Sequence, residues 1–367
     1  MKPDPGIKRI LCIRPDNMGD ILMSTPAIRA LKEYFGAHIT LLTSRQGSPI
    51  ADFIPEIDDT IVADLPWVQL TGPVGDMKPV IEELSSGAFD LAVIFTVFSQ
   101  SALPSALLAL MAGIPRRLAY ARENPYELLT NWVPDDEPFG PIHHQVHRDL
   151  KLVATIGART LSTALSLEVP QPAQLRLSAK LKRIGIDNTM PFMVLHAGTT
   201  DLKRQYTMEN WIAVGKRVIQ QCQMPLLLTG SEKEHKMTAP VWKGINEPLC
   251  YNIAGQLSLD ELLSLINNCR LLITVNSLPL HIASALKKPV VVAYAKTNPQ
   301  HTPWQTLHKV LYFDVPQTLQ SRNRLLHFMA GTYSWQGPEA TVNQMVHAVV
   351  SMVRQDISCK AVSSTLS

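Results

Sequence analysis

Cysteine is scarce in this 367-residue chain, and its spacing excludes two classes of protein. The five cysteines are Cys12, Cys222, Cys250, Cys269 and Cys359, with no C-x-x-C pair among them. A disulfide-stapled secreted domain or a zinc ribbon would need cysteines paired at short spacing. Scattered thiols, two of them in or beside apolar runs, predict a reducing compartment, and we expect a cytoplasmic protein.

The chain also lacks the marks of export and of membrane insertion. No apolar stretch follows the basic residues within the first nine positions, so no signal peptide is expected. Residues 91–114 carry no charge and are long enough to span a bilayer, which takes about 20 residues. Their character changes midway, from β-branched and aromatic residues to alanine and leucine. A buried strand followed by a packed helix is therefore predicted, with peripheral contact at the inner face of the membrane at most.

Several ligand-binding signatures are missing as well. No G-x-G-x-x-G follows a predicted strand and no G-x-x-x-x-G-K occurs, which argues against dehydrogenases and P-loop NTPases. No segment combines a basic block with aromatic residues, so no nucleic-acid partner is expected. His143, His144 and His147 include a pair at i, i+4, but without an H-E-x-x-H pattern or a nearby cysteine. A histidine-rich helix start is favoured over a metal site.

Charge is unevenly divided, although the net value is only +3. Residues 1–170 carry 14 basic and 20 acidic residues, a balance of −6, whereas residues 171–367 carry 20 and 11, a balance of +9. Such a division indicates that the second half binds an anion.

Short apolar segments alternate with amphipathic ones along the chain. Strands are predicted at 9–14, 38–43, 60–63, 91–98, 192–196, 226–229, 271–275, 290–294 and 309–313. This alternation predicts an α/β protein whose parallel sheets are covered on both faces. Two prolines in a polar run at 168–174 suggest a linker between two Rossmann-like, doubly wound domains that face a central cleft. We expect domains at 1–170 and 171–357 and a disordered tail at 358–367.

Ligands of such sheets bind beyond the carboxyl ends of the strands, and the first such turn is N-M-G-D at 17–20. Gly19 permits a tight turn, and Asp20 then stands where a helix begins. Asp20 is either a first-turn acid of that helix, worth about 1 kcal/mol, or a catalytic base. Pro26 favours the second interpretation, because proline belongs in a first helical turn and Ser24 or Thr25 would then be the cap.

The second half contains a turn suited to phosphate. Gly198 follows a predicted strand, Thr199 and Thr200 offer hydroxyl donors, and Lys203 brings positive charge. These are the parts of a phosphate cradle, although a polar loop with a solvated lysine would look the same.

Two further turns complete the candidate site. Gly230 follows another strand, and either Glu232 or Glu234 could accept hydrogen bonds from ribose, or simply start a helix. Later, a strand ends at Asn276, and Ser277 can cap the next helix, whose N-terminus attracts anions. His281, one turn on, points at that anion or into the core.

Taken together and in this order, the turns resemble glycosyltransferase family nine, the lipopolysaccharide heptosyltransferase family. The matching segments are D-N-M-G-D-I-L-M-S-T-P-A-I-R-A-L at 16–31, F-D-L-A-V-I-F at 89–95, A-G-T-T-D-L-K at 197–203, L-T-G-S-E-K-E at 228–234, I-A-G-Q-L-S-L-D-E-L at 253–262 and N-S-L-P-L-H-I-A-S-A-L-K-K-P-V-V at 276–291. The resemblance covers about residues 8–305.

The resemblance implies the GT-B architecture, with an acceptor on the first domain and a nucleotide-sugar donor on the second. It also implies an inverting transfer without a metal or other cofactor, with ADP-heptose as the suspected donor and an envelope glycan or lipid-linked sugar as acceptor. By position, Asp20 would be the general base. The donor-binding residues would be Thr199, Thr200, Lys203, Glu234, Asn276, Ser277 and His281.

This chain departs from the family pattern at Asn276-Ser277-Leu278, where the family usually reads Asp-Ser/Thr-Gly. The change removes a carboxylate that could contact the sugar, and leucine penalises a positive φ in the loop. The family also usually carries Trp soon after the lysine, where this chain offers only Tyr206. A catalytically impaired nucleotide-sugar-binding protein with a regulatory or scaffold role is therefore the alternative. A sugar-nucleotide epimerase of the same architecture is a third reading, which no acidic cluster supports.

Overall fold

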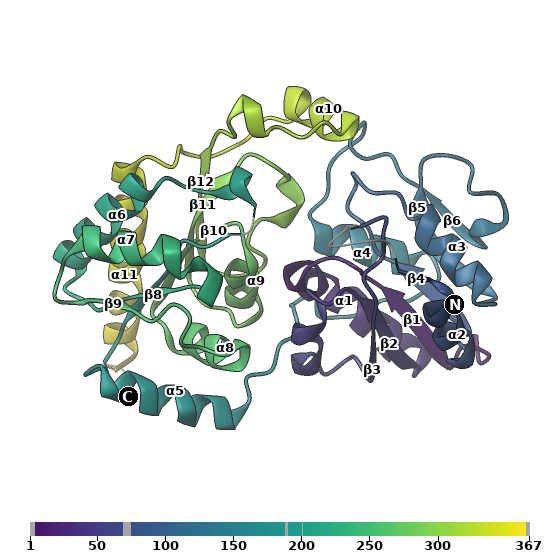
Figure 1. Ribbon diagram of the computed structural model, residues 1–367, viewed down its shortest axis with the longest axis horizontal. Coiled ribbons are helices and arrows are strands. Elements are labelled where there is room, and N and C mark those ends of the chain that lie inside the picture. Colours follow the sequence, from purple (N-terminus) through teal and green to yellow (C-terminus); the bar gives the residue numbers. More distant parts are fainter. Residues whose placement is uncertain (1–3, 69–74, 188–189, 200, 365–367) are drawn as a thin grey trace. The chain divides into compact units, whose positions relative to one another are not determined.

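A computed structural model describes residues 4–68, 75–187, 190–199 and 201–364 (Figure 1). The chain divides into two compact units. The first comprises residues 1–168 with two later segments, 299–301 and 323–331, and the second comprises the remainder. Each unit is built around one parallel six-stranded sheet.

The sheet of the first unit has the strand order β3-β2-β1-β4-β5-β6. Its strands are β1 (Arg9–Ile13), β2 (His38–Thr43), β3 (Asp59–Val62), β4 (Leu91–Ile94), β5 (Arg116–Ala121) and β6 (Asn131–Pro134). The helices of this part are α1 (Met18–Phe35), α2 (Lys78–Ser86), α3 (Leu103–Met111), α4 (Gln145–Ala154) and α10 (Arg324–Thr332). The central strand β1 is buried from Ile10 onward, so the turn after it stands at the middle of the sheet edge.

The uncharged stretch 91–114 forms β4 and then α3, as predicted. The division follows the composition, because the strand ends on the β-branched pair Val93 and Ile94 whereas the helix consists mainly of alanine and leucine. None of the helices in the described part of the chain combines the length and the hydropathy needed to cross a bilayer.

The sheet of the second unit has the order β12-β11-β10-β7-β8-β9. Its strands are β7 (Met193–His196), β8 (Leu226–Thr229), β9 (Cys250–Asn252), β10 (Leu271–Val275), β11 (Val290–Ala295) and β12 (His308–Phe313). The helices are α5 (Gln171–Arg183), α6 (Met208–Cys222), α7 (His235–Ile245), α8 (Leu259–Asn268), α9 (Leu278–Ala285) and α11 (Val342–Ser364). Helices α6, α7 and α11 cover one face of the sheet, while α8 and α9 lie on the other (Figure 1).

The α/β class and the parallel sheets are confirmed, and all nine predicted strands are present within a residue or a few of their expected bounds. Three further strands, β5, β6 and β9, extend each sheet to six. Helix α11 continues to Ser364, inside the segment 358–367 for which composition predicts disorder, and residues 365–367 lie outside the described residues.

Candidate active site

Asp20 lies at the carboxyl end of β1, in the first turn of α1. Its Oδ2 accepts a hydrogen bond from the backbone N–H of Asn17 at 3.3 Å, which ties it to the start of the helix. Its Oδ1 lies 3.2 Å from Nη2 of Arg14 and 3.8 Å from Nε2 of His301. The side chain is 15% exposed, so the carboxylate is both anchored and accessible.

The predicted cap at Ser24 or Thr25 is wrong, because α1 already begins at Met18 and contains Pro26 in its interior. Proline removes the N–H that would reach the Leu22 carbonyl, and the Thr25 hydroxyl replaces it with a bond of 2.7 Å. The helix therefore passes through Pro26 with that carbonyl satisfied. Gly19 is part of this helix rather than of a separate turn.

A cluster of buried charges surrounds Arg14, whose side chain is fully buried. Its Nε lies 3.3 Å from Oδ2 of Asp16, and Asp149 of α4 also acts on it electrostatically. Burial lowers the pKa of Arg14, but the neighbouring carboxylates outweigh that effect and raise it. Burial raises the pKa of Asp149 to about 6, against the opposing effects of Arg14 and of hydrogen bonds from Ser24 and Gln145.

This raised pKa gives a pH-dependent stability. The Asp149 carboxyl group binds its proton more tightly in the folded state than in the unfolded state, where its pKa is 3.8. The stability that this proton contributes is present below pH 3.8 and is lost as the pH rises through the folded-state pKa of about 6. Asp149→Asn removes this loss, so the variant should gain up to about 3 kcal/mol on wild type between pH 4 and pH 7. Urea unfolding of both proteins at a series of pH values measures the difference. A constant difference across that range would contradict the assignment.

In the second unit, the three predicted turns follow β10, β7 and β8, which are neighbours in the sheet. Because these strands are parallel, their carboxyl ends lie at one edge, and the residues that follow them come together there. The three turns that the sequence predicts to form one site therefore follow neighbouring strands of one sheet.

Glu234 lies against the turn that follows β7. A Cβ added to Gly198 would stand 2.3 Å from Oε1 of Glu234, so any larger residue there would displace the carboxylate from its present position. The other oxygen accepts hydrogen bonds from the N–H and hydroxyl of Ser231 at 2.7 and 2.9 Å. His196, at the end of β7, is buried, and burial lowers its pKa while Glu234 acts in the opposite direction. Gly230 also lies against Glu234, because a Cβ added to Gly230 would stand 3.2 Å from the Cβ of Glu234.

The cationic turn after β7 contacts the end of β10. Arg204 donates through Nη1 to the Asn276 carbonyl at 3.1 Å. Thr199 accepts the N–H of Asp201 at 3.2 Å, and Asp201 in turn accepts the N–H of Lys203 at 3.1 Å. Among the described residues no hydrogen bond or ion pair holds the Lys203 ammonium. Thr200 lies outside the described residues.

The Asn276-Ser277-Leu278 segment adopts ordinary backbone geometry. Leu278 is the first residue of α9 and Ser277 its extended N-cap, so the expected penalty of leucine at a positive φ does not arise. The Asn276 side chain accepts the Ala295 N–H and donates to the Thr297 hydroxyl, both at 3.3 Å. His281 is buried within α9.

Tyr206, which stands near the position of the family's tryptophan, is buried. Its ring packs edge-on against Trp211 at 4.9 Å and its hydroxyl donates to the Ala340 carbonyl, so it belongs to the core of the second unit.

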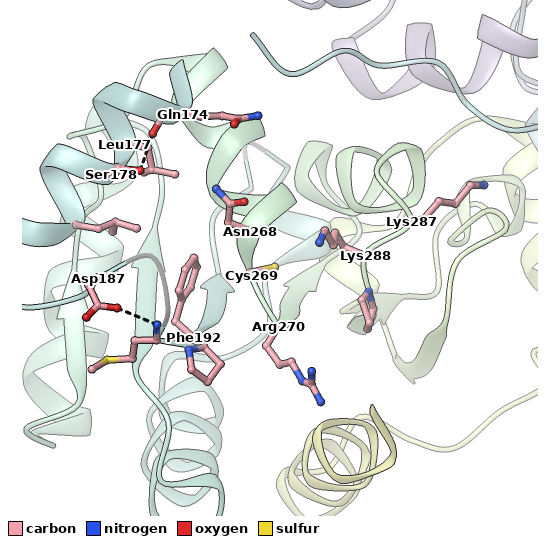
Figure 2. Close-up of a pocket in the computed structure, with 14 residues that line it drawn as sticks. Gln174, Leu177, Ser178, Asp187, Phe192, Asn268, Cys269, Arg270, Lys287 and Lys288 are labelled. Carbon is pink, nitrogen blue, oxygen red and sulfur yellow. Dashed lines mark hydrogen bonds between the residues drawn. The ribbon is translucent and has the colours of Figure 1, made fainter. Parts of the chain in front are cut away.

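A hollow of about 600 Å³ lies at the other end of this sheet, by the amino ends of β7, β10 and β11 (Figure 2). Three cations contribute to its lining, but they diverge. Lys287 Nζ is held 3.2 Å from the Gln305 carbonyl and Arg270 extends toward Val353, so only Lys288 lies beside Cys269 (Figure 2). The hollow is therefore remote from the predicted turns, and its three cationic side chains do not point at a common position where an anion could bind.

No three His, Cys, Asp or Glu side chains are grouped as metal ligands among the residues that the structure describes. His144 caps α4 by accepting the N–H of Val146 at 3.2 Å, and His143 Nε2 lies 2.7 Å from Nζ of Lys151. The predicted helix start is what the structure contains.

Sequence reasoning missed Arg14, Asp149 and His196 as members of the site. Arg14 directly follows the strand that precedes Asp20 and could have been noticed. Asp149 could not, because only the packing of α4 on α1 brings it there.

Comparison with known proteins places these features in a family. Residues 78–324 match the model of glycosyltransferase family 9 (heptosyltransferase). Lipopolysaccharide heptosyltransferase 2 of Escherichia coli K12 is 27% identical over 308 residues, 80% of this chain and 85% of the relative. A family 9 glycosyltransferase structure from Veillonella parvula has a TM-score of 0.76 at 19% identity, covering 95% of this chain and 98% of the other. E. coli ADP-heptose lps heptosyltransferase II has a TM-score of 0.70 at 22% identity, covering 95% and 99%.

Proposed function

The chain belongs to glycosyltransferase family 9, the heptosyltransferase family, and we propose that it transfers heptose from ADP-heptose to a lipopolysaccharide-type acceptor with inversion. The E. coli relatives named for lipopolysaccharide heptosyltransferase activity and for ADP-heptose support this choice of acceptor class and donor. The acceptor would be met in the cytoplasm or at the inner face of the membrane, by peripheral contact.

The observation that carries the proposal is the anchored, accessible carboxylate of Asp20 at the end of the central strand. In the proposed step an acceptor hydroxyl attacks the anomeric carbon of the donor. The bond from that carbon to the nucleoside diphosphate breaks as the new C–O bond forms on the opposite face. Asp20 takes the hydroxyl proton, a contribution of about 10²–10⁴-fold.

The donor diphosphate would bind in the second unit, which comes from the half of the chain with the positive charge balance. Lys203 and the N-terminus of α9 at Ser277 would stabilise the departing diphosphate, with Thr199, Thr200, Asn276 and His281 around it. Glu234 would accept hydrogen bonds from ribose. We propose that these groups supply the charge stabilisation of the leaving group without a metal, so turnover should persist in EDTA.

The test offers the purified protein a panel of nucleotide sugars, including ADP-heptose, with an envelope extract rich in lipopolysaccharide. Release of ADP and labelling of the glycan by wild type, and their loss in Asp20→Ala, support the transferase. Equal turnover by both proteins would rule out Asp20 as the base.

A second candidate is a nucleotide-sugar-binding protein with little or no activity. It is favoured by Asn276, whose amide is engaged with Ala295 and Thr297 and brings no carboxylate to the sugar. Tight donor binding by calorimetry, without turnover in either wild type or the Asp20 variant, would select this function.

Replacing Gly198 with alanine should weaken donor binding. The new Cβ would force the Glu234 carboxylate away from its present position and break its bonds to Ser231. We expect the dissociation constant for ADP to rise about tenfold or more, the value of one lost hydrogen bond to a charged group. Calorimetry measures it, with Gly75→Ala as control because nothing lies within 4 Å of that position. Unchanged affinity would remove Glu234 from the donor site.

A further inference from the structure

A second carboxylate is buried behind the helix that carries Asp20. Asp149 is 1% exposed and comes from α4, which packs on α1. Its Oδ2 accepts a 2.7 Å hydrogen bond from the hydroxyl of Ser24, one turn after Asp20, and its Oδ1 accepts one of 2.8 Å from Gln145. A charge so placed has no access to substrate and needs another explanation.

Arg14 is shared among three carboxylates. It contacts Asp20 at 3.2 Å and Asp16 at 3.3 Å, and Asp149 acts on it through its charge. Alone, a buried guanidinium beside Asp20 would make that carboxylate a poor proton acceptor. With Asp16 and Asp149 ionised, the groups around Asp20 carry net negative charge from these three residues, and its basicity is preserved.

We propose that Asp149 is a positioning residue whose negative charge offsets Arg14 and so keeps Asp20 basic enough to accept the proton of the acceptor hydroxyl. The inference rests on the proposed function of Asp20. It concerns charge rather than contact, and therefore predicts an effect on the pH profile that a purely structural role would not produce.

Asparagine is a close uncharged substitute at position 149. Its amide group can donate to the Ser24 hydroxyl, which then donates to the Asp20 carbonyl 3.2 Å away. Its oxygen still accepts from Gln145. The hydrogen bonds to Ser24 and Gln145 are thus kept while the charge is lost.

Other titrating or charged groups face these two carboxylates and bear on the profile. Arg14, Arg148 and Tyr120 act on or respond to Asp149. Arg14, Asp16 and His301 surround Asp20. All of them are retained in the variants below.

The test compares pH profiles of turnover for wild type, Asp149→Asn and Asp52→Asn, using ADP-heptose and the envelope extract. Asp52 is an exposed carboxylate of the same unit, so its variant loses one charge without touching the cluster. For Asp149→Asn we expect kcat to fall about three- to tenfold with donor KM unchanged. The fall in turnover that accompanies protonation of Asp149 in wild type should be absent, since position 149 no longer titrates, and the remaining acid limb, due to Asp20, should lie at lower pH. Asp52→Asn should match wild type.

A second variant tests the inference without removing the Asp149 carboxylate. Ser24→Ala keeps the Asp149 carboxylate but removes a hydrogen bond to its ionised form, so Asp149 binds its proton at higher pH. The fall in turnover on acidification should therefore begin at higher pH, with the plateau of kcat unchanged. Opposite shifts in the two variants support the inference. An unshifted limb in either variant, or a fall in kcat without a shift, overturns it. Turnover retained in Asp20→Ala, or absent in wild type, overturns the proposed function instead.

Discussion

Asp20→Asn should lower the turnover number by about 10²–10⁴-fold, the range typical of losing a general base. An amide cannot take the acceptor proton, yet it has nearly the shape of the carboxylate and can still accept the Asn17 N–H. The loss of stability should stay near about 1 kcal/mol, the value of a first-turn acid. Steady-state ADP release at saturating donor gives kcat, and thermal unfolding gives the stability.

Two comparisons make this result decisive. Asp52→Asn removes an exposed carboxylate from the same unit and should leave turnover intact. The affinity of Asp20→Asn for ADP should equal that of wild type, because the proposed donor residues lie in the second unit. A fall in kcat below tenfold would mean that another group accepts the proton.

Arg148→Met should destabilise the first unit by about 3 kcal/mol. The Arg148 side chain is 2% exposed, and its two Nη atoms lie 2.8 and 3.0 Å from the oxygens of Asp135, while Nε donates to the Thr96 carbonyl at 2.9 Å. Removing the guanidinium leaves Glu137 and Asp135 buried with fewer partners. The value lies at the low end of the usual range because Arg122 still pairs with Asp135.

Urea unfolding monitored by far-UV circular dichroism measures the change, and Arg159→Met is the matched control because Arg159 is exposed. We expect the control to stay within about 0.5 kcal/mol of wild type. A loss below about 1 kcal/mol in Arg148→Met would show that the remaining cations compensate fully for it.

The central strands could be predicted because their environment is uniform. Strands such as β10 and β11 are buried along their whole length and therefore appear as unbroken apolar runs. β5 was missed because it begins with Arg116 and Arg117. The Arg117 guanidinium donates to the carbonyls of Ile114, Glu127 and Leu128, so a charge is accommodated in a strand by backbone groups that the sequence does not reveal. β6 and β9 are short strands at sheet edges with weak patterns.

The parts of the candidate site that lie directly after a strand could be predicted from the sequence, whereas the parts that come together only through helix packing could not. Turns after β7, β8 and β10 follow from strand ends, and so does the location of Asp20. The start of α1 was misjudged because Pro26 normally marks a first turn, and the compensating bond from Thr25 to Leu22 involves a hydroxyl that has many possible partners. Asp149, by contrast, reaches the charges around Arg14 from a helix far along the chain, and no local pattern reports that packing.

The return of residues 299–301 and 323–331 to the first unit limits how the enzyme can be recombined with its relatives. A chimera joined once, near residue 168, would take these segments from the wrong parent. Gln300 donates to the buried carboxylate of Glu137 at 2.7 Å and to the His143 carbonyl at 3.1 Å, so a foreign segment would have to reproduce both bonds. In this chain a single crossover near residue 168 therefore does not separate the two units, because the first unit is completed by residues encoded within the second half.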